Sequence, residues 1–140
     1  MWGLLQGFRW LDRALQQSRD ARGWAPIGGT ESQIMFFVAA GTNRPSEIAR
    51  QLGISRQAVH KAVHTLVERK LVVLEDDPND RRGRVIAFSA EGAAERRDTQ
   101  DIIVQLEREL EARIGKRALE ACKSALRRDW GEPPVLDRDG

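Results

Sequence analysis

The sequence has a single cysteine, Cys122, and no long apolar run. One cysteine cannot form a disulfide within the chain, which agrees with a reducing compartment. No stretch approaches the length needed to cross a bilayer, and residues 1–5 lack the basic flank and cleavage signature of a signal peptide. We therefore expect a cytoplasmic protein with no membrane partner. A hydrophobic content of 41% in 140 residues is enough for one domain with its own core.

Patterns that indicate catalysis are also missing. No phosphate-binding glycine loop, dinucleotide-binding fingerprint or Ser/His/Asp arrangement occurs. His60 and His64 are spaced i and i+4, so both lie on one helix face where they can bind a metal. However, no cysteine lies near them, and no metalloprotease glutamate accompanies them. We predict a protein that is not an enzyme, with no catalytic residue, cofactor or metal site; a metal-responsive regulator using His60 and His64 is an alternative.

Positive charge is concentrated in the middle of the chain. The net charge of the whole chain is only +2, which says little about partners. Residues 44–84 hold 9 Lys and Arg against 6 Asp and Glu, a net charge of +3, whereas residues 85–140 hold 10 against 12, a net of −2. A phosphate-binding surface requires such an excess. Because chance also produces a difference of this size, the charge supports nucleic-acid binding only together with a motif.

Residues 44–70 contain that motif. Residues 46–52 predict a short helix, Gly53 supplies a tight turn, and Ser55 is placed to cap a second helix. The second helix has an apolar stripe formed by Val59, Ala62, Val63, Leu66 and Val67. Two helices joined by a short glycine turn are typical of a helix-turn-helix, whose second helix enters the DNA major groove.

The other side of this second helix is polar and basic. Gln57 can pair with adenine, and Arg56 or Lys61 with guanine or phosphate. His60 and His64 can donate hydrogen bonds to either. A solvated helix face explains any one of these residues but not the whole set. We therefore assign contacts with double-stranded DNA to Ser55, Arg56, Gln57, His60, Lys61 and His64.

A β-hairpin is predicted directly after the second helix. Residues 71–74 and 85–88 are short β-rich runs, and residues 75–84 between them form the remaining hairpin and its charged tip. A helix-turn-helix followed by such a hairpin is a winged helix-turn-helix. The predicted fold is therefore mainly α with a small β-hairpin wing (α+β), in which residues 30–90 form the DNA-binding lobe.

Helices are predicted on both sides of this lobe. Residues 2–19 repeat apolar residues on one stripe, and residues 91–130 are helical with a break near Gly115. Thr30 has the position of an N-cap in a capping box, and it opens a helix that is apolar all round and therefore predicted to lie in the core. The apolar surplus at both ends predicts a homodimer through residues 1–20 and 91–130, with packing within one chain as the alternative. Residues 131–140 are expected to form a tail.

The order of these elements and the wing sequence resemble the MarR family of dimeric bacterial transcriptional regulators. The family's wing has the pattern Asp-x-Arg, apolar strand residues, then Leu-Thr-x-x-Gly. Here the corresponding segments are Asp80-Arg81-Arg82, Val85-Ile86-Ala87 and Phe88-Ser89-Ala90-Glu91-Gly92. Phe88 and Ser89 stand where Leu and Thr are usual, and both are mild changes. Lys70 departs from the pattern, because it stands where a glycine usually ends the recognition helix in a left-handed conformation, at a cost of about 1 kcal/mol.

This resemblance implies a single MarR-like domain over residues 1–140. It places Arg82 at the minor groove, Arg81 and Arg84 on phosphates, and Asp80 as a carboxylate that orients the arginines of the wing. It also implies a role as a repressor of an inverted-repeat operator, controlled by a small-molecule effector. A charged, soluble hairpin tip is the plain alternative for the wing. A winged helix that binds an acidic protein is the alternative function.

Two further features have ordinary explanations besides a sensing role. Cys122 lies on the apolar stripe of the last helix, where a small buried side chain is expected. Aromatic side chains can line an effector pocket, although apolar residues at helical spacing are more often plain core. The aromatic candidates for such a pocket are Trp2, Phe8, Trp10, Trp24, Phe36 and Phe37.

Overall fold

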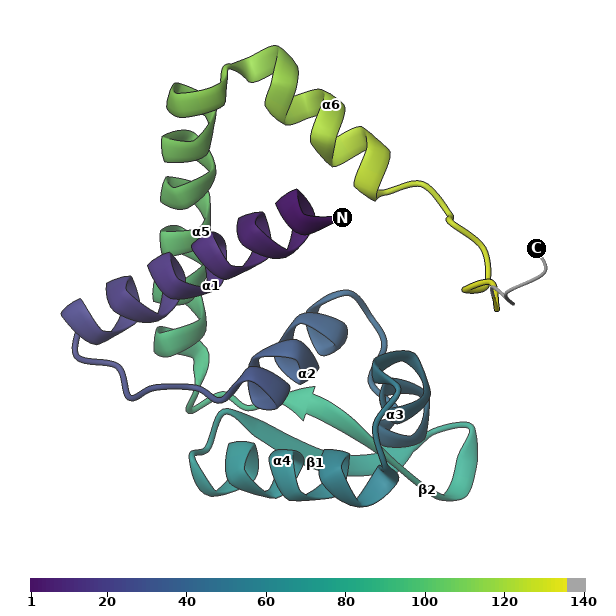
Figure 1. Ribbon diagram of the computed structural model, residues 1–140. Helices are drawn as coiled ribbons and strands as arrows, with labels where there is room; N and C mark the ends of the chain where they lie inside the picture. The colour runs from purple at the N-terminus through teal and green to yellow at the C-terminus, as the bar shows by residue number, and fades with distance from the viewer. Residues whose placement is uncertain (136–140) are drawn as a thin grey trace. The chain divides into compact units, whose positions relative to one another are not determined.

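The computed structural model describes residues 1–135, which form six helices and one antiparallel hairpin (Figure 1). The elements are α1 (Trp2–Ala21), α2 (Gly29–Ala39), α3 (Pro45–Leu52), α4 (Arg56–Glu68), β1 (Val72–Asp77), β2 (Asp80–Phe88), α5 (Ala93–Ile114) and α6 (Lys116–Leu126). Backbone contacts divide the chain into two compact units after Ile103, within α5. The mainly α fold with a two-stranded wing was predicted correctly.

The helix-turn-helix is built from α3 and α4 as expected. Gly53 ends α3 in the left-handed conformation, with φ of 64°, and Ile54 N–H bonds to the carbonyl of Ala49. The Oγ of Ser55 accepts a hydrogen bond from the N–H of Ala58 (3.0 Å), which caps the start of α4. The sequence therefore fixes both ends of the turn through local chemistry.

The core of the first unit lies where α2, α3, α4 and the base of the wing meet. The apolar stripe of α4 is buried there as predicted, with Val67 at its partly buried edge. Leu71 and Val72 at the start of β1 and Ile86 in β2 complete the core. One side of α4 thus belongs to the core, which leaves its other side to solvent.

Two expectations for α2 were wrong. The helix begins at Gly29 with Gly28 as N-cap, and no side chain caps it, so Thr30 lies inside the first turn. Only Ile34 of the apolar run is fully buried, and Phe36 is 52% exposed. The helix packs against α4 and β2, where Met35, Phe37 and Val38 are only partly buried, so its apolar composition did not bury it on all sides.

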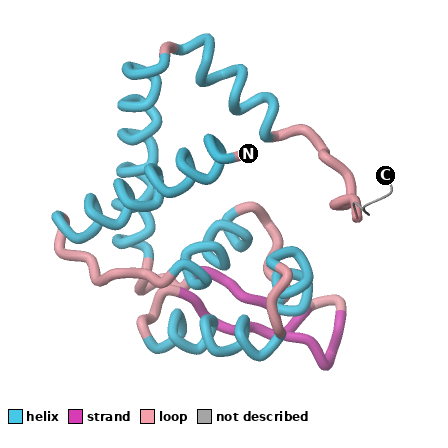
Figure 2. Tube along the Cα trace, in the orientation of Figure 1, coloured by secondary structure: helices cyan, strands magenta, loops and turns pink. Residues whose placement is uncertain are grey.

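The wing is longer than predicted. Its strands pair in antiparallel register from Val72 opposite Phe88 to Asp76 opposite Arg84, with an irregularity before Asp77 (Figure 2). Within residues 75–84, expected to hold the rest of the hairpin and its tip, most residues are strand, and the turn is limited to Pro78 and Asn79. The N–H of Ile86 also bonds to the carbonyl of Asn43 (2.9 Å), which ties the wing to the chain before α3.

The second unit contains the end of α5 and α6. Gly115 separates the two helices with φ of 84°, at the predicted break. Leu119 is buried, and Lys123 forms an ion pair with Glu107. Cys122 is exposed in the single chain, which corrects the expectation of a buried side chain. Of the predicted tail, residues 136–140 lie outside the described residues.

None of the helices in residues 1–135 combines the length and apolarity that a membrane crossing needs.

Candidate nucleic-acid interface

The solvent face of α4 presents a continuous set of polar and basic side chains. The structure places Arg56, Gln57, His60, Lys61 and His64 on this face, and each of them is exposed. Within residues 1–135, no ion pair occupies Arg56 or Lys61, whereas His64 lies 3.3 Å from Glu68. Cationic side chains held on a helix face without protein partners are suited to phosphate oxygens and base edges.

A hollow of about 480 Å³ lies where α3 turns into α4. It is open to solvent and is lined in part by Ser46, Arg50 and Arg56. Arg50 is exposed in the last turn of α3 and was not among the predicted site residues. The signal for it in the sequence was a basic residue two positions before Leu52, on the solvent side of a short amphipathic helix.

The wing carries three exposed arginines beside its turn. Arg81 and Arg82 are exposed, and Arg84 pairs with Asp76 across the strands at 3.3 Å. The Oδ1 of Asp80 accepts the backbone N–H of Arg82 (3.0 Å). Asp80 was predicted to orient the arginines of the wing, and the contact that it makes is with the backbone of Arg82 and not with an arginine side chain.

A second carboxylate of the wing that holds an arginine side chain is Asp77, which was not among the predicted site residues. Its Oδ2 accepts Arg44 Nε (2.6 Å), its Oδ1 accepts Arg44 Nη2 (3.2 Å), and the N–H of Asn79 donates to it at 2.9 Å. Hydrogen bonding to Arg44 lowers the pKa of Asp77, and the same bond raises the pKa of Arg44. The Asp77-Pro78-Asn79 sequence was the available signal, because such a segment typically forms a turn.

The base of the wing is fixed by a serine and a glycine from the family-like motif. Ser89 Oγ donates to the carbonyl of Lys70 and accepts the N–H of Gly92 (2.9 Å). A Cβ on Gly92 would come within 3.0 Å of Leu71 Cα. These contacts hold the end of β2 against the residues that follow α4.

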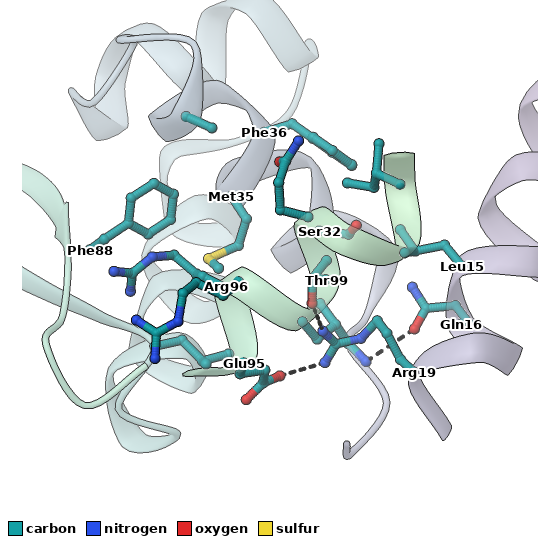
Figure 3. A pocket seen from close by; sticks show the side chains of 16 residues that line it. Leu15, Gln16, Arg19, Ser32, Met35, Phe36, Phe88, Glu95, Arg96 and Thr99 are labelled. Carbon is teal, nitrogen blue, oxygen red and sulfur yellow. Dashed lines mark hydrogen bonds and ion pairs between the residues drawn. The ribbon is translucent and has the colours of Figure 1, made fainter. Parts of the chain in front are cut away.

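A cavity of about 330 Å³ lies between α1, α2, the base of the wing and the first part of α5 (Figure 3). Its wall is mostly apolar, with Leu15, Met35 and Ile103 among the lining residues, and Arg96 and Arg97 add positive charge. Arg96 also lies 4.7 Å above the ring of Phe88. Of the six aromatic candidates, Phe36 alone lines this cavity.

Trp24, another of those candidates, instead donates a hydrogen bond to Asp98 (2.6 Å). Within residues 1–135, no three His, Cys, Asp or Glu side chains lie close enough together to hold a metal ion. His60 and His64 therefore have no third ligand among the described residues.

One family model and several solved structures are similar to this chain. A sequence model of the MarR family matches residues 26–83, whereas no curated protein matches the chain. The transcriptional repressor CouR bound to a 23-mer DNA duplex has a TM-score of 0.71 and 20% identity, covering 89% of this chain and 87% of that one. CouR from Rhodococcus jostii RHA1 bound to p-coumaroyl-CoA gives 0.67 and 20%, covering 88% and 85%. MarR from E. coli gives 0.65 and 20%, covering 89% and 92%.

Proposed function

We propose that the chain is a DNA-binding transcriptional regulator of the MarR family and that it acts as a homodimeric repressor of an inverted-repeat operator. The observation that carries this proposal is the exposed polar face of α4 opposite its buried stripe. A recognition helix needs that division, because one face must be held rigidly while the other reaches base edges.

We assign the DNA contacts by the position of each side chain. Arg56, Gln57, His60, Lys61 and His64 read or approach the major groove from α4, and Arg82 reaches the minor groove from the wing. Arg81 and Arg84 bind phosphates, and Arg84 must then leave its exposed pair with Asp76. Such a pair is worth little in water, so phosphate can replace the carboxylate at low cost. Ser55 caps α4 and also lies at the DNA-facing end of that helix.

The apolar face of α1 supports a homodimer. Trp2 is 65% exposed and Phe8 is 56% exposed, and Leu4, Leu5 and Leu11 on the same helix are exposed as well. An apolar surface of this extent on one helix is a common sign of a protein interface. We propose that residues 1–20 and 91–130 form the dimer and that residues 30–90 form the DNA-binding lobe of a single domain.

The cavity beside α5 supports control by a small molecule. It is largely apolar and has Arg96 and Arg97 at its wall, so it suits an organic molecule with a negatively charged group. CouR, a similar structure, was solved with p-coumaroyl-CoA. An effector regulates only if it binds the free dimer and the DNA-bound dimer with different affinities. Equal affinity for the two states rules this part of the proposal out.

Selection from a pool of random duplexes tests the proposed specificity. We expect the purified protein to enrich an inverted repeat whose half-sites lie about 10 bp apart, one helical turn of DNA. Enrichment of no sequence would favour the alternative of a winged helix that binds protein. A variant with Arg56, Gln57 and Lys61 all changed to alanine should lose the selection while keeping the fold, because these side chains are exposed.

A further inference from the structure

Glu95, near the start of α5, lies between two arginines from different helices. Its Oε1 accepts hydrogen bonds from Arg19 in α1 and from Arg69 Nη2, the latter at 3.4 Å. Arg19 is 2% exposed and Glu95 is 13% exposed, so both charges are largely removed from water. Figure 3 shows Arg19 and Glu95 pointing toward each other beside the cavity.

Arg69 is the residue that directly follows the recognition helix. It occupies the C-cap of α4, and its guanidinium donates to the carbonyl of Pro26 (2.6 Å) and to that of Ala25 (3.2 Å). Arg19 donates to the same Ala25 carbonyl at 3.2 Å. The end of the recognition helix is thus attached to the segment between α1 and α2 and, through Glu95, to α5.

Glu95 supplies the negative charge that faces the two guanidinium groups of Arg19 and Arg69. Two guanidinium groups share one carboxylate and one backbone carbonyl, and Arg19 Nε is buried without a hydrogen-bond partner. Removing the carboxylate leaves two neighbouring cations partly buried, which is strongly unfavourable. Arg69, with 24% of its side chain exposed, is the one of the two that can move into solvent.

We propose that Glu95 is a positioning residue for DNA binding, which fixes the angle of α4 by holding Arg69. This rests on the proposed function, because α4 must be the element that reads DNA. Glu95 does not touch DNA in this account. Its negative charge would in fact repel phosphates, so its contribution is through the orientation of α4 alone.

The substitution E95Q separates positioning from simple electrostatics. Loss of a negative charge by itself strengthens DNA binding, because fewer phosphates are repelled. Loss of the contact between Glu95 and Arg69, in contrast, weakens DNA binding because α4 is no longer held in place. We expect E95Q to bind the selected operator about tenfold more weakly than the wild type, since Arg69 and Glu95 act as a coupled pair.

D98N is the matched control. Asp98 lies one turn further along α5 and accepts hydrogen bonds from Arg22 (2.5 Å) and Trp24. It therefore makes the same kind of contact with the α1 end but none with α4. We expect D98N to bind the operator as tightly as the wild type or more tightly. R69Q is the second variant, because Arg69 is more exposed and its replacement leaves no buried unpaired charge of its own.

Backbone hydrogen exchange of residues 65–71 in the free protein supplies a readout independent of DNA. We expect faster exchange there in E95Q and R69Q, unchanged exchange in D98N, and no further loss of affinity in the E95Q/R69Q double variant. Unchanged exchange in E95Q, tighter operator binding by E95Q, or a D98N effect equal to that of E95Q would overturn the proposal. If the wild type selects no operator, the proposed function is wrong. Hydrogen exchange then tests by itself whether Glu95 holds Arg69 and the end of α4.

Discussion

Asp77 at the end of β1 and Arg44 before α3 are joined by two hydrogen bonds, Oδ2 to Nε at 2.6 Å and Oδ1 to Nη2 at 3.2 Å. The carboxylate is buried, with 3% of its side chain exposed, whereas 46% of the Arg44 side chain remains exposed. The pair connects the wing to the start of the helix-turn-helix across 33 positions of sequence. It therefore attaches the end of β1, beside the turn of the wing, to the residue before α3.

This relationship predicts a pH dependence of stability. Hydrogen bonding to Arg44 lowers the pKa of Asp77 below its ordinary value of 3.8. A carboxyl group with a lowered pKa stabilises the fold above the pKa of the unfolded chain, and this contribution disappears as the pH falls through the folded value. We expect D77N to be less stable than the wild type at pH 7 and the difference to narrow below about pH 4.

Urea unfolding between pH 7 and pH 2.5 measures this dependence. D76N is the control, because the side chain of Asp76 is 89% exposed. Its stability should follow that of the wild type at every pH. A constant difference between D77N and the wild type over the whole range would contradict the account.

Lys70 has a left-handed backbone, with φ of 59°, and is the sole non-glycine residue with positive φ in residues 1–135. The N–H groups of Lys70 and Leu71 close the end of α4 on the carbonyls of Val67 and Leu66. Glycine adopts this conformation without strain, so K70G should raise the free energy of unfolding by about 1 kcal/mol. K70A, which removes the exposed pair with Glu91 but keeps the strain, should not raise it. Equal stability of the two variants in urea would show that the backbone there is unstrained.

The exposed apolar face of α1 predicts the effect of a charge at its centre. F8E places a carboxylate on a surface that we expect to be buried between two chains, where an unpaired charge is costly. Sedimentation equilibrium should show a dimer for the wild type and a monomer for F8E. Q6E adds the same charge two positions away, on the other side of the helix, and should remain dimeric. A wild-type protein that sediments as a monomer would contradict the proposed dimer.

Arg82 is the wing residue that we assign to the minor groove. R82A should weaken operator binding by about 1–3 kcal/mol if Arg82 recognises the width of the minor groove. The loss of affinity should be greatest for A·T-rich flanks, where the minor groove is narrow. R117A removes an equal charge from α6 and should leave affinity unchanged. If both variants lose the same affinity for every flank, Arg82 contributes only general charge.

Local chemistry made the centre of the fold predictable. Gly53 and Ser55 act within one turn of their own position, so sequence alone placed the turn and the start of α4. The prediction of Thr30 as N-cap was wrong because Gly28, two residues earlier, is the N-cap, and a capping box is only one of several ways to start a helix. Lys70 was identified through the family pattern, not through composition or periodicity.

Ion pairs between residues far apart in the sequence could not be predicted. Glu95 is one of several acidic residues in a charged helix, and nothing near it in sequence identifies Arg19 and Arg69 as partners at separations of 76 and 26 positions. The same holds for Asp77 and Arg44. The exposed polar residues of α4 could be predicted because they share one helix face, whereas the residues that contact the end of this helix come from other elements.

Fluorescence anisotropy of the purified protein with duplex DNA from upstream of its own gene tests the central claim most directly. A scrambled duplex of the same composition is the control, and each is titrated at two salt concentrations. The account predicts tight binding to the upstream duplex, saturation at two chains per site, and a steep fall in affinity with salt. Equal and weak binding to both duplexes would contradict sequence-specific recognition at this site.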